Sequence, residues 1–96
     1  MTLLKNKPLI DLISRINLDA RGWAVVDHWD GDLCAIGITK AEDRSRLCYV
    51  STWRKDSGYF DYECEIELEP GSPEVSARGV NVNFQELLEA MERHLG

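Results

Sequence analysis

YFDYECEIELE, residues 59–69, is the stretch of this chain that decides its fold. Apolar and acidic side chains alternate along it, so the two faces of an extended chain would differ in kind. The apolar face would carry Phe60, Tyr62, Cys64, Ile66 and Leu68. The acidic face would carry Asp61, Glu63, Glu65, Glu67 and Glu69. Such alternation is typical of an antiparallel strand with one side in the core, so we predict a long strand here.

Upstream of this strand, three segments have the β-branched and aromatic composition of strands: residues 23–29, 33–39 and 47–53. The dipeptide Asp30-Gly31 separates the first two segments. It favours a two-residue hairpin, because both central positions of a type I′ turn need a positive φ. The polar segment 54–58 separates the third segment from the long strand. Since the connections are short, we predict that consecutive strands are neighbours in an antiparallel meander.

The two hairpins predict which residues lie opposite each other in the sheet. The first hairpin predicts two pairs: Val25 with Ile36, and Trp23 with Ile38. The second hairpin predicts three pairs: Thr52 with Phe60, Val50 with Tyr62, and Cys48 with Cys64. All of these side chains would then lie on one side of the sheet, which we expect the helices to cover.

Helices are predicted near both ends of the sequence. In residues 8–17, apolar side chains recur at the i, i+3, i+4, i+7 spacing of one helical face. Near the end of the sequence, Asn83 can cap a second helix, and Glu86 three residues later can reach back to it. Val82 and Leu87 fit a hydrophobic staple at the same helix start. The buried side of this helix would consist of Phe84, Leu87, Leu88, Met91 and Leu95.

The predicted architecture is a single α+β domain, residues 1–96. Its sheet is an antiparallel meander of four to five strands, with the N- and C-terminal helices packed on one face. After the Pro70-Gly71-Ser72-Pro73 segment, which ends the long strand, residues 74–78 are predicted to form a short edge strand. We expect the following residues to be largely buried: Leu12, Ile36, Val50, Phe60, Tyr62, Ile66, Leu87 and Met91.

The composition narrows the class of partner. Seventeen acidic residues against eleven basic ones give a formal net charge of -6. This charge repels phosphate backbones and anionic lipid headgroups, so neither nucleic acid nor a membrane surface is expected as a partner. Uncharged stretches are far shorter than the roughly 20 apolar residues of a membrane span. Lys5, Lys7 and Asp11 also interrupt the segment where a signal peptide needs an apolar run, so we expect a cytoplasmic protein.

The three cysteines lie in strand-like patterns and lack the CxxC spacing of zinc or redox sites: Cys34, Cys48 and Cys64. We interpret them as free thiols in a reducing compartment, with Cys48 and Cys64 as a cross-strand pair that oxidation could join. The segment DHWDGD, residues 27–32, contains ligand types, but Asp27 and His28 would point to opposite faces of a strand. It also lacks the D-x-D-x-D-G pattern of a calcium loop. No metal and no other cofactor is predicted.

The sheet face opposite the predicted core mixes aromatic and acidic side chains. A solvated antiparallel face is usually more polar than this, so the mixture indicates a surface on which a protein partner docks. The candidate contact residues are Tyr49, Trp53, Tyr59, Asp61, Glu63 and Glu65. An ordinary solvated face is the alternative interpretation. The carboxylates of this face would then be neutralised within the chain by Arg44, Arg46, Arg54 or Lys55.

No catalytic residue is predicted. The sequence has no nucleophile motif, no glycine-rich phosphate-binding loop and no HExxH spacing. His94 falls in the last turn of the predicted C-terminal helix, where its charge suits the helix dipole. A small enzyme that works through a carboxylate pair such as Glu63 and Glu65 is retained as an alternative.

The order of these elements resembles small immunity proteins of bacterial polymorphic toxin systems. The resemblance rests on the N-terminal helix, the Gly22-Trp23 entry into the meander, the segment YFDYE at 59–63 and the closing helix NFQELL at 83–88. It implies a bacterial, cytoplasmic protein that neutralises a cognate toxin domain by binding it through an acidic surface, and we therefore expect the toxin domain to be basic. It assigns no role to any single residue. A secretion-chaperone-like or regulatory adaptor, often dimeric, is the alternative, so monomer and homodimer both stay open.

Overall fold

The computed structural model describes residues 5–26 and 33–96, and in these residues the five strands are joined as an antiparallel meander in the order β1-β2-β3-β4-β5. The strands are β1 Trp23–Val26, β2 Ala35–Lys40, β3 Asp43–Ser51, β4 Tyr59–Glu69 and β5 Ser72–Asn83. The helices are α1 Lys7–Ile16, the single turn α2 Leu18–Arg21, and α3 Phe84–Leu95. The predicted α+β class and meander topology are confirmed.

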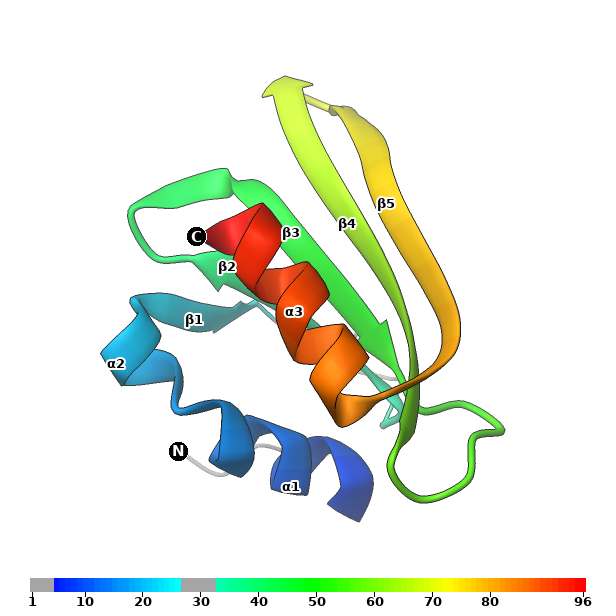
Figure 1. The fold of residues 1–96 in the computed structure, drawn as a ribbon. Coiled ribbons are helices and arrows are strands. Elements are labelled where there is room, and N and C mark those ends of the chain that lie inside the picture. Colours follow the sequence, from blue (N-terminus) through cyan, green and yellow to red (C-terminus); the bar gives the residue numbers. More distant parts are fainter. Residues whose placement is uncertain (1–4, 27–32) are drawn as a thin grey trace.

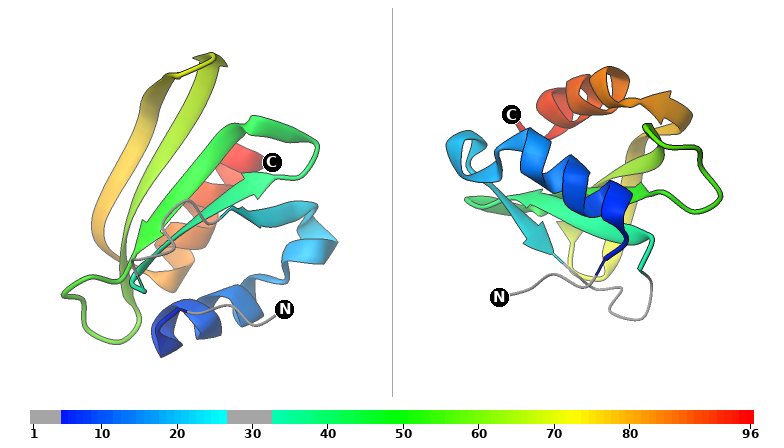
Figure 2. Two further views of the ribbon diagram at one scale, coloured as in Figure 1. Left: turned by 180° about the vertical axis from the view of Figure 1, so that it is seen from behind. Right: turned by 90° about the horizontal axis from the view of Figure 1, so that it is seen from below.

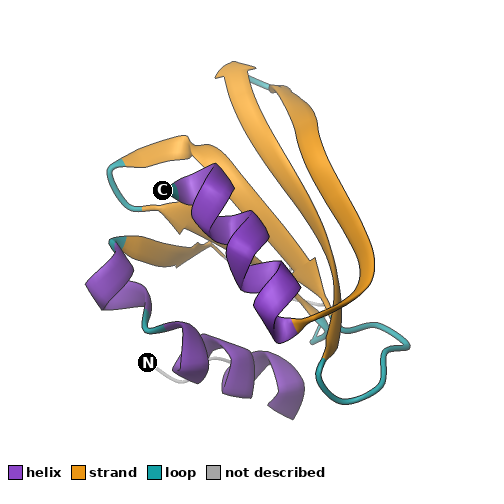
Figure 3. Cartoon of the chain, in the orientation of Figure 1, coloured by secondary structure: helices purple, strands orange, loops and turns teal. Residues whose placement is uncertain are grey.

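Helices and sheet form two layers. The helices lie together on one face of the sheet, which is clearest when the molecule is seen from below (Figure 2, right). Helix α3 packs on β3, β4 and β5, while α1 lies beside α3 on the same side (Figures 1 and 3). The prediction that both terminal helices cover one face is therefore confirmed.

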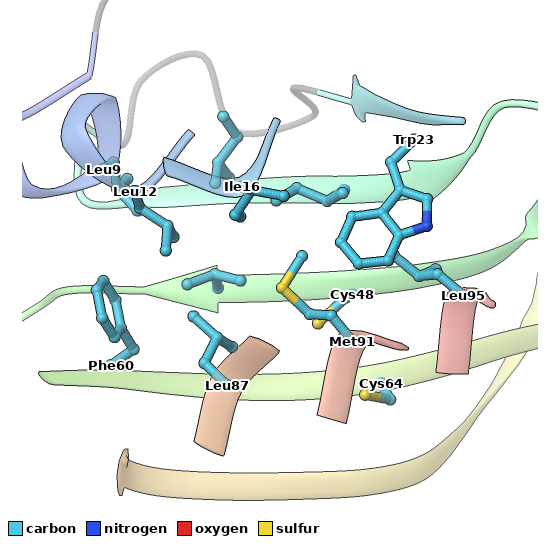
Figure 4. Packing of buried hydrophobic residues seen from close by; sticks show 13 residues of the cluster. Leu9, Leu12, Ile16, Trp23, Cys48, Phe60, Cys64, Leu87, Met91 and Leu95 are labelled. Atoms are coloured by element: carbon cyan, nitrogen blue, oxygen red, sulfur yellow. The ribbon is translucent and has the colours of Figure 1, made fainter. Parts of the chain in front are cut away.

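The core lies between these layers (Figure 4). It contains residues from both long helices and from all strands except β5: Leu9, Leu12, Ile16, Trp23, Ile36, Ile38, Cys48, Val50, Phe60, Cys64, Leu87, Met91 and Leu95. Six of the eight residues predicted to be buried belong to it. The other two predictions, Tyr62 and Ile66, are wrong because both residues are only half-buried. Strand β4 runs beyond the helices that cover it (Figure 1), and Leu68 further along is 71% exposed.

The predicted register is confirmed for β3 and β4, where Cys48 lies opposite Cys64 and Val50 opposite Tyr62. The pair of Thr52 with Phe60 falls outside the ladder, because β3 ends at Ser51.

The predicted register between β1 and β2 is wrong. Val25 pairs with Ile38 instead of Ile36, and Trp23 pairs with Lys40. The difference is two residues, and because side chains alternate with a period of two, every side chain keeps its predicted face. The Asp30-Gly31 turn lies outside the described residues.

Strands β3 and β5 have other bounds than predicted, and the differences lie in polar segments of the chain. Strand β3 begins at Asp43, directly after a turn at residues 41–42, so most of the predicted polar connection is strand. Strand β5 extends over Ser72–Asn83, more than twice the length of the predicted residues 74–78. No residue of β5 is buried, so its sequence lacks the alternating pattern that a half-buried strand imposes.

The start of α3 confirms the predicted capping box. The Asn83 Oδ1 atom accepts a hydrogen bond from the Glu86 N–H at 2.8 Å, and the Glu86 side chain accepts one from the Asn83 N–H at 3.3 Å. Val82 and Leu87, the predicted staple residues, belong to one apolar cluster. These contacts fix the point at which β5 ends and α3 begins.

Replacing Asn83 with Ala should lower the free energy of unfolding by about 1 kcal/mol, because the first turn of α3 then loses its capping acceptor. Urea denaturation followed by circular dichroism measures this change. Gln85→Ala is the matched control, since Gln85 is exposed in the same turn and should cost within about 0.5 kcal/mol. Equal costs for the two variants would show that the capping box contributes little.

Candidate functional site

The sheet face that points away from the helices is exposed over only part of the sheet. Ala35, Gly37 and Thr39 of β2 alternate with core residues, yet they too are buried. Exposure begins with the strands β3, β4 and β5, and the candidate contact residues lie on β3, on β4 and in the segment that follows β3. The part of this face that a partner can contact is therefore the half formed by β3, β4 and β5.

A hollow of about 320 Å³ lies on this half of the face. We call it the aromatic hollow, and its lining residues are Tyr49, Ser51, Trp53, Asp61, Tyr62, Glu63, Arg78, Gly79 and Val80. Four of the six predicted contact residues are among them. The structure thus brings together side chains from β3, from β4 and from the segment that follows β3.

Two large apolar side chains of the hollow are strongly exposed. Trp53 is 61% exposed and Val80 is 70% exposed. The backbone N–H of Trp53 donates a hydrogen bond to Ser51 Oγ at 3.2 Å, and this bond fixes the backbone where it leaves β3. The guanidinium of Arg54 lies 5.5 Å from the centre of the Trp53 ring, within the range of a cation–π contact. Trp53 is therefore presented to solvent by local contacts.

The two carboxylates of the hollow have cationic partners within the chain. Asp61 lies 2.9 Å from Lys55 Nζ and also accepts a hydrogen bond from the Asn81 N–H at 2.9 Å. Glu63 lies 3.3 Å from Arg78 Nη2. The alternative interpretation, in which cations of the chain itself neutralise these carboxylates, therefore holds for Asp61 and Glu63. Lys55 was one of the four cations expected to do this, whereas Arg78 was not.

The remaining two predicted contact residues lie outside the aromatic hollow. Tyr59 is 42% exposed at the start of β4. Glu65 lines a second hollow, also of about 320 Å³, whose other lining residues are Val26, Thr39, Arg44, Ser45, Leu47, Glu67 and Pro73. Glu63 and Glu65, the carboxylate pair considered for acid–base chemistry, therefore line different hollows.

Negative charge is concentrated in the far part of the β4–β5 hairpin. We call residues 65–75 the acidic arm, because this segment contains four glutamates and no basic residue. These glutamates are Glu65, Glu67, Glu69 and Glu74, and none of them forms an ion pair with any other described residue. The tip of the arm extends past α3 (Figure 1), and Glu67, Glu69 and Glu74 are exposed, whereas Glu65 is half-buried.

Sequence reasoning missed Arg78 and Val80 as site residues. Both belong to β5, which was predicted to end at residue 78. The signal that could have placed them is the second half of β5, where Val80 and Val82 alternate with polar residues just before the helix cap.

Neither a metal centre nor a membrane-spanning helix is found in the part of the chain that the structure describes. Within residues 5–26 and 33–96, no three His, Cys, Asp or Glu side chains gather as metal ligands would. The DHWDGD segment, with Asp27 and His28, lies outside the described residues. The helices described are all too short or too polar to cross a membrane. Comparison of the chain with protein families, with curated proteins and with solved structures found no match.

Proposed function

We propose that this chain is a non-catalytic protein-binding domain of a bacterial cytoplasm, and that it neutralises a basic toxin domain by binding it. The observation that carries the proposal is the exposed Trp53 and Val80 at the rim of the aromatic hollow, next to an acidic arm without internal cations. The resemblance to immunity proteins supplies the kind of partner. The aromatic hollow and the acidic arm supply complementary parts of a binding site.

The aromatic hollow would provide most of the affinity. Exposed Trp and Tyr side chains bury a large area at the cost of ordering few rotatable bonds, and they dominate the energetics of many protein interfaces. The Asp61 and Glu63 carboxylates are held by Lys55 and Arg78 within the chain, so they can accept further hydrogen bonds without remaining uncompensated on burial. The hollow thus combines exposed apolar side chains with carboxylates whose charge is balanced by cations of the same chain.

The acidic arm would provide steering. Unpaired carboxylates on one side of a protein attract a cationic partner over a Debye length of about 8 to 10 Å and raise its association rate. Each exposed pair that forms in the complex contributes at most about 1 kcal/mol, so the arm affects the rate of encounter more than the lifetime of the complex.

The site is proposed to be non-catalytic because of the way in which its carboxylates are held. A general base needs an oxygen that can reach the proton of a substrate. Asp61 is engaged by Lys55 and by the Asn81 N–H, while Glu63 is engaged by Arg78. These contacts favour a binding role for the hollow.

Binding kinetics with the partner, captured from the native host by the tagged chain, test this proposal. Trp53→Ala should weaken the complex by about 2 kcal/mol, or roughly 30-fold, almost entirely through faster dissociation. Ile10→Ala is the control, because Ile10 is 40% exposed on α1, in the other layer. Glu65→Lys combined with Glu67→Lys should instead slow association about tenfold and reduce its salt dependence.

Two results would contradict the proposal. Wild-type kinetics in both the Trp53 variant and the double charge reversal would place the contact surface on the helices or loops. A stable homodimer by light scattering that dissociates on Trp53→Ala would assign the hollow to self-association, as in the adaptor alternative.

A further inference from the structure

Two thiols meet beneath α3, on the side of the sheet opposite the aromatic hollow. Cys48 of β3 and Cys64 of β4 are direct partners in the antiparallel ladder, and both are buried (Figure 4). Directly opposed residues of antiparallel strands have Cα atoms about 4.5 to 5.5 Å apart. A disulfide spans about 4.4 to 6.8 Å between Cα atoms, so the backbone already has a separation that a disulfide can bridge.

A small cavity leads to Cys64 and not to Cys48. It has a volume of about 150 Å³ and is lined by Cys64, Ser76, Ala77, Ala90, Arg93 and His94, at the border between α3 and β5. A space of this size admits a molecule as small as a peroxide. The two cysteines therefore differ in how a small oxidant would reach them.

His94 is fixed in this cavity by hydrogen bonds on both ring nitrogens. Its Nε2 atom lies 2.9 Å from the carbonyl oxygen of Glu65, which requires the proton on Nε2. Its Nδ1 atom lies 3.4 Å from Ser76 Oγ. The adjacent residue Arg93 adds a positive charge to the cavity wall. The lining of the cavity thus combines the Cys64 thiol with the polar side chains of Ser76, Arg93 and His94.

The two thiols are also unequal in acidity. A hydrogen bond from Cys48, together with the nearby Arg93 charge, lowers the pKa of Cys64 against the opposing effect of burial. The same hydrogen bond and the burial of Cys48 raise the pKa of Cys48 well above its usual value. The thiolate, which is the reactive form, therefore forms at Cys64 first.

We propose that Cys48 and Cys64 form a peroxide-sensitive dithiol, in which Cys64 reacts first and Cys48 closes the disulfide. The Cys64 thiolate attacks one oxygen of hydrogen peroxide and the O–O bond breaks. The hydroxide that leaves takes up the proton from Cys64 to form water, and Cys64 becomes a sulfenic acid. The Cys48 sulfur then attacks the Cys64 sulfur and the S–O bond breaks. The leaving hydroxide takes the Cys48 proton as a second water. The two thiols lose two electrons, which the peroxide gains.

The disulfide would join the two strands that carry the floor of the aromatic hollow on their other side. Tyr49 follows Cys48 in β3, and Glu63 precedes Cys64 in β4. The dithiol itself does not depend on the proposed function, because it rests on residues of the core and of the α3–β5 border.

Oxidation of the native wild-type chain by hydrogen peroxide, followed by alkylation and mass spectrometry, tests the proposal. The expected product has lost two hydrogen atoms, and its peptide map links Cys48 to Cys64. Reduction by dithiothreitol should restore the starting mass. A Cys34→Ser variant should form the same link at the same rate. Native protein in which Cys48 and Cys64 stay reduced while Cys34 is oxidised would overturn the proposal, as would a link that includes Cys34.

The order of reaction is tested separately. In Cys48→Ser, dimedone should label Cys64 as a sulfenic acid, whereas in Cys64→Ser no label should appear at Cys48. Arg93→Gln should slow disulfide formation several-fold in a chain with the wild-type core. Arg44→Gln, an exposed arginine at the start of β3, is its control and should leave the rate unchanged. Equal rates in these two variants would overturn the role of the cavity.

Discussion

Replacing Phe60 with Ala should lower the free energy of unfolding by about 3 to 5 kcal/mol, which approaches the whole stability of a small domain. Phe60 is 3% exposed and lies in the core beside Leu87 of α3, opposite Val82 of β5 (Figure 4). Removing the ring loses its apolar burial and leaves a cavity between the sheet and both long helices. Urea denaturation measures the loss, and the slope of the transition shows whether the variant still unfolds in one step.

Tyr59→Ala is the matched control for this variant. Tyr59 is the preceding residue, it is also aromatic, and at 42% exposure it lies on the other face of β4. Its removal should cost less than about 1 kcal/mol. Similar costs at the two positions would contradict the assignment of faces on which the core and the candidate site both depend.

The parts of the fold that the sequence predicted well are those in which burial imposes a pattern. Strand β4 has its predicted ends at residues 59 and 69, because its apolar and acidic residues alternate throughout. The same alternation, with the short connection at 54–58, set the register between β3 and β4 correctly. Helix α3 was equally clear, since the capping box at Asn83 and the apolar spacing along the helix agree.

The errors occur where no buried face constrains the sequence. No residue of β5 is fully buried, so periodicity did not indicate the length of the strand, and only the alternation of Val80 and Val82 with polar residues indicated its second half. The register between β1 and β2 was inferred from one turn dipeptide. A shift of two residues leaves every side chain on the same face of the sheet, so the alternation of apolar and polar residues cannot reveal it.

The candidate site was predicted as a face, and the structure divides that face in two. Residues from β3 and β4 that share a side of the sheet, such as Tyr49 and Glu63, could be grouped from alternation alone. Lys55 was among the cations expected to pair with this face, but the Glu63–Arg78 pair could not be predicted, because it depends on the register of β5, which contains bulges. Without the Glu63–Arg78 pair, the charge-balanced hollow could not be distinguished from the acidic arm, whose glutamates form no ion pair with any other described residue.

Replacing Gly79 with Ala should destabilise the domain by up to about 3 kcal/mol, because the position is already occupied by the ring of Tyr62. Gly79 lies directly opposite Tyr62 in the sheet. A Cβ atom at Gly79 would clash with Cε2 of that ring and would lie 2.8 Å from Cζ. The ring packs against the core on the helix side of the sheet, so it must swing away from β5 and lose part of that packing.

A double-mutant cycle isolates this contact. In a Tyr62→Ala background the clash is absent, and Gly79→Ala should become neutral or stabilising, since glycine within a strand is less favourable than alanine by roughly 0.5 to 1 kcal/mol. The coupling energy between the two positions should therefore exceed about 1 kcal/mol, as expected for residues in direct contact. An equal cost of Gly79→Ala in both backgrounds would show that Tyr62 does not cover the glycine. The glycine would then be needed for the backbone of β5 close to its bulge.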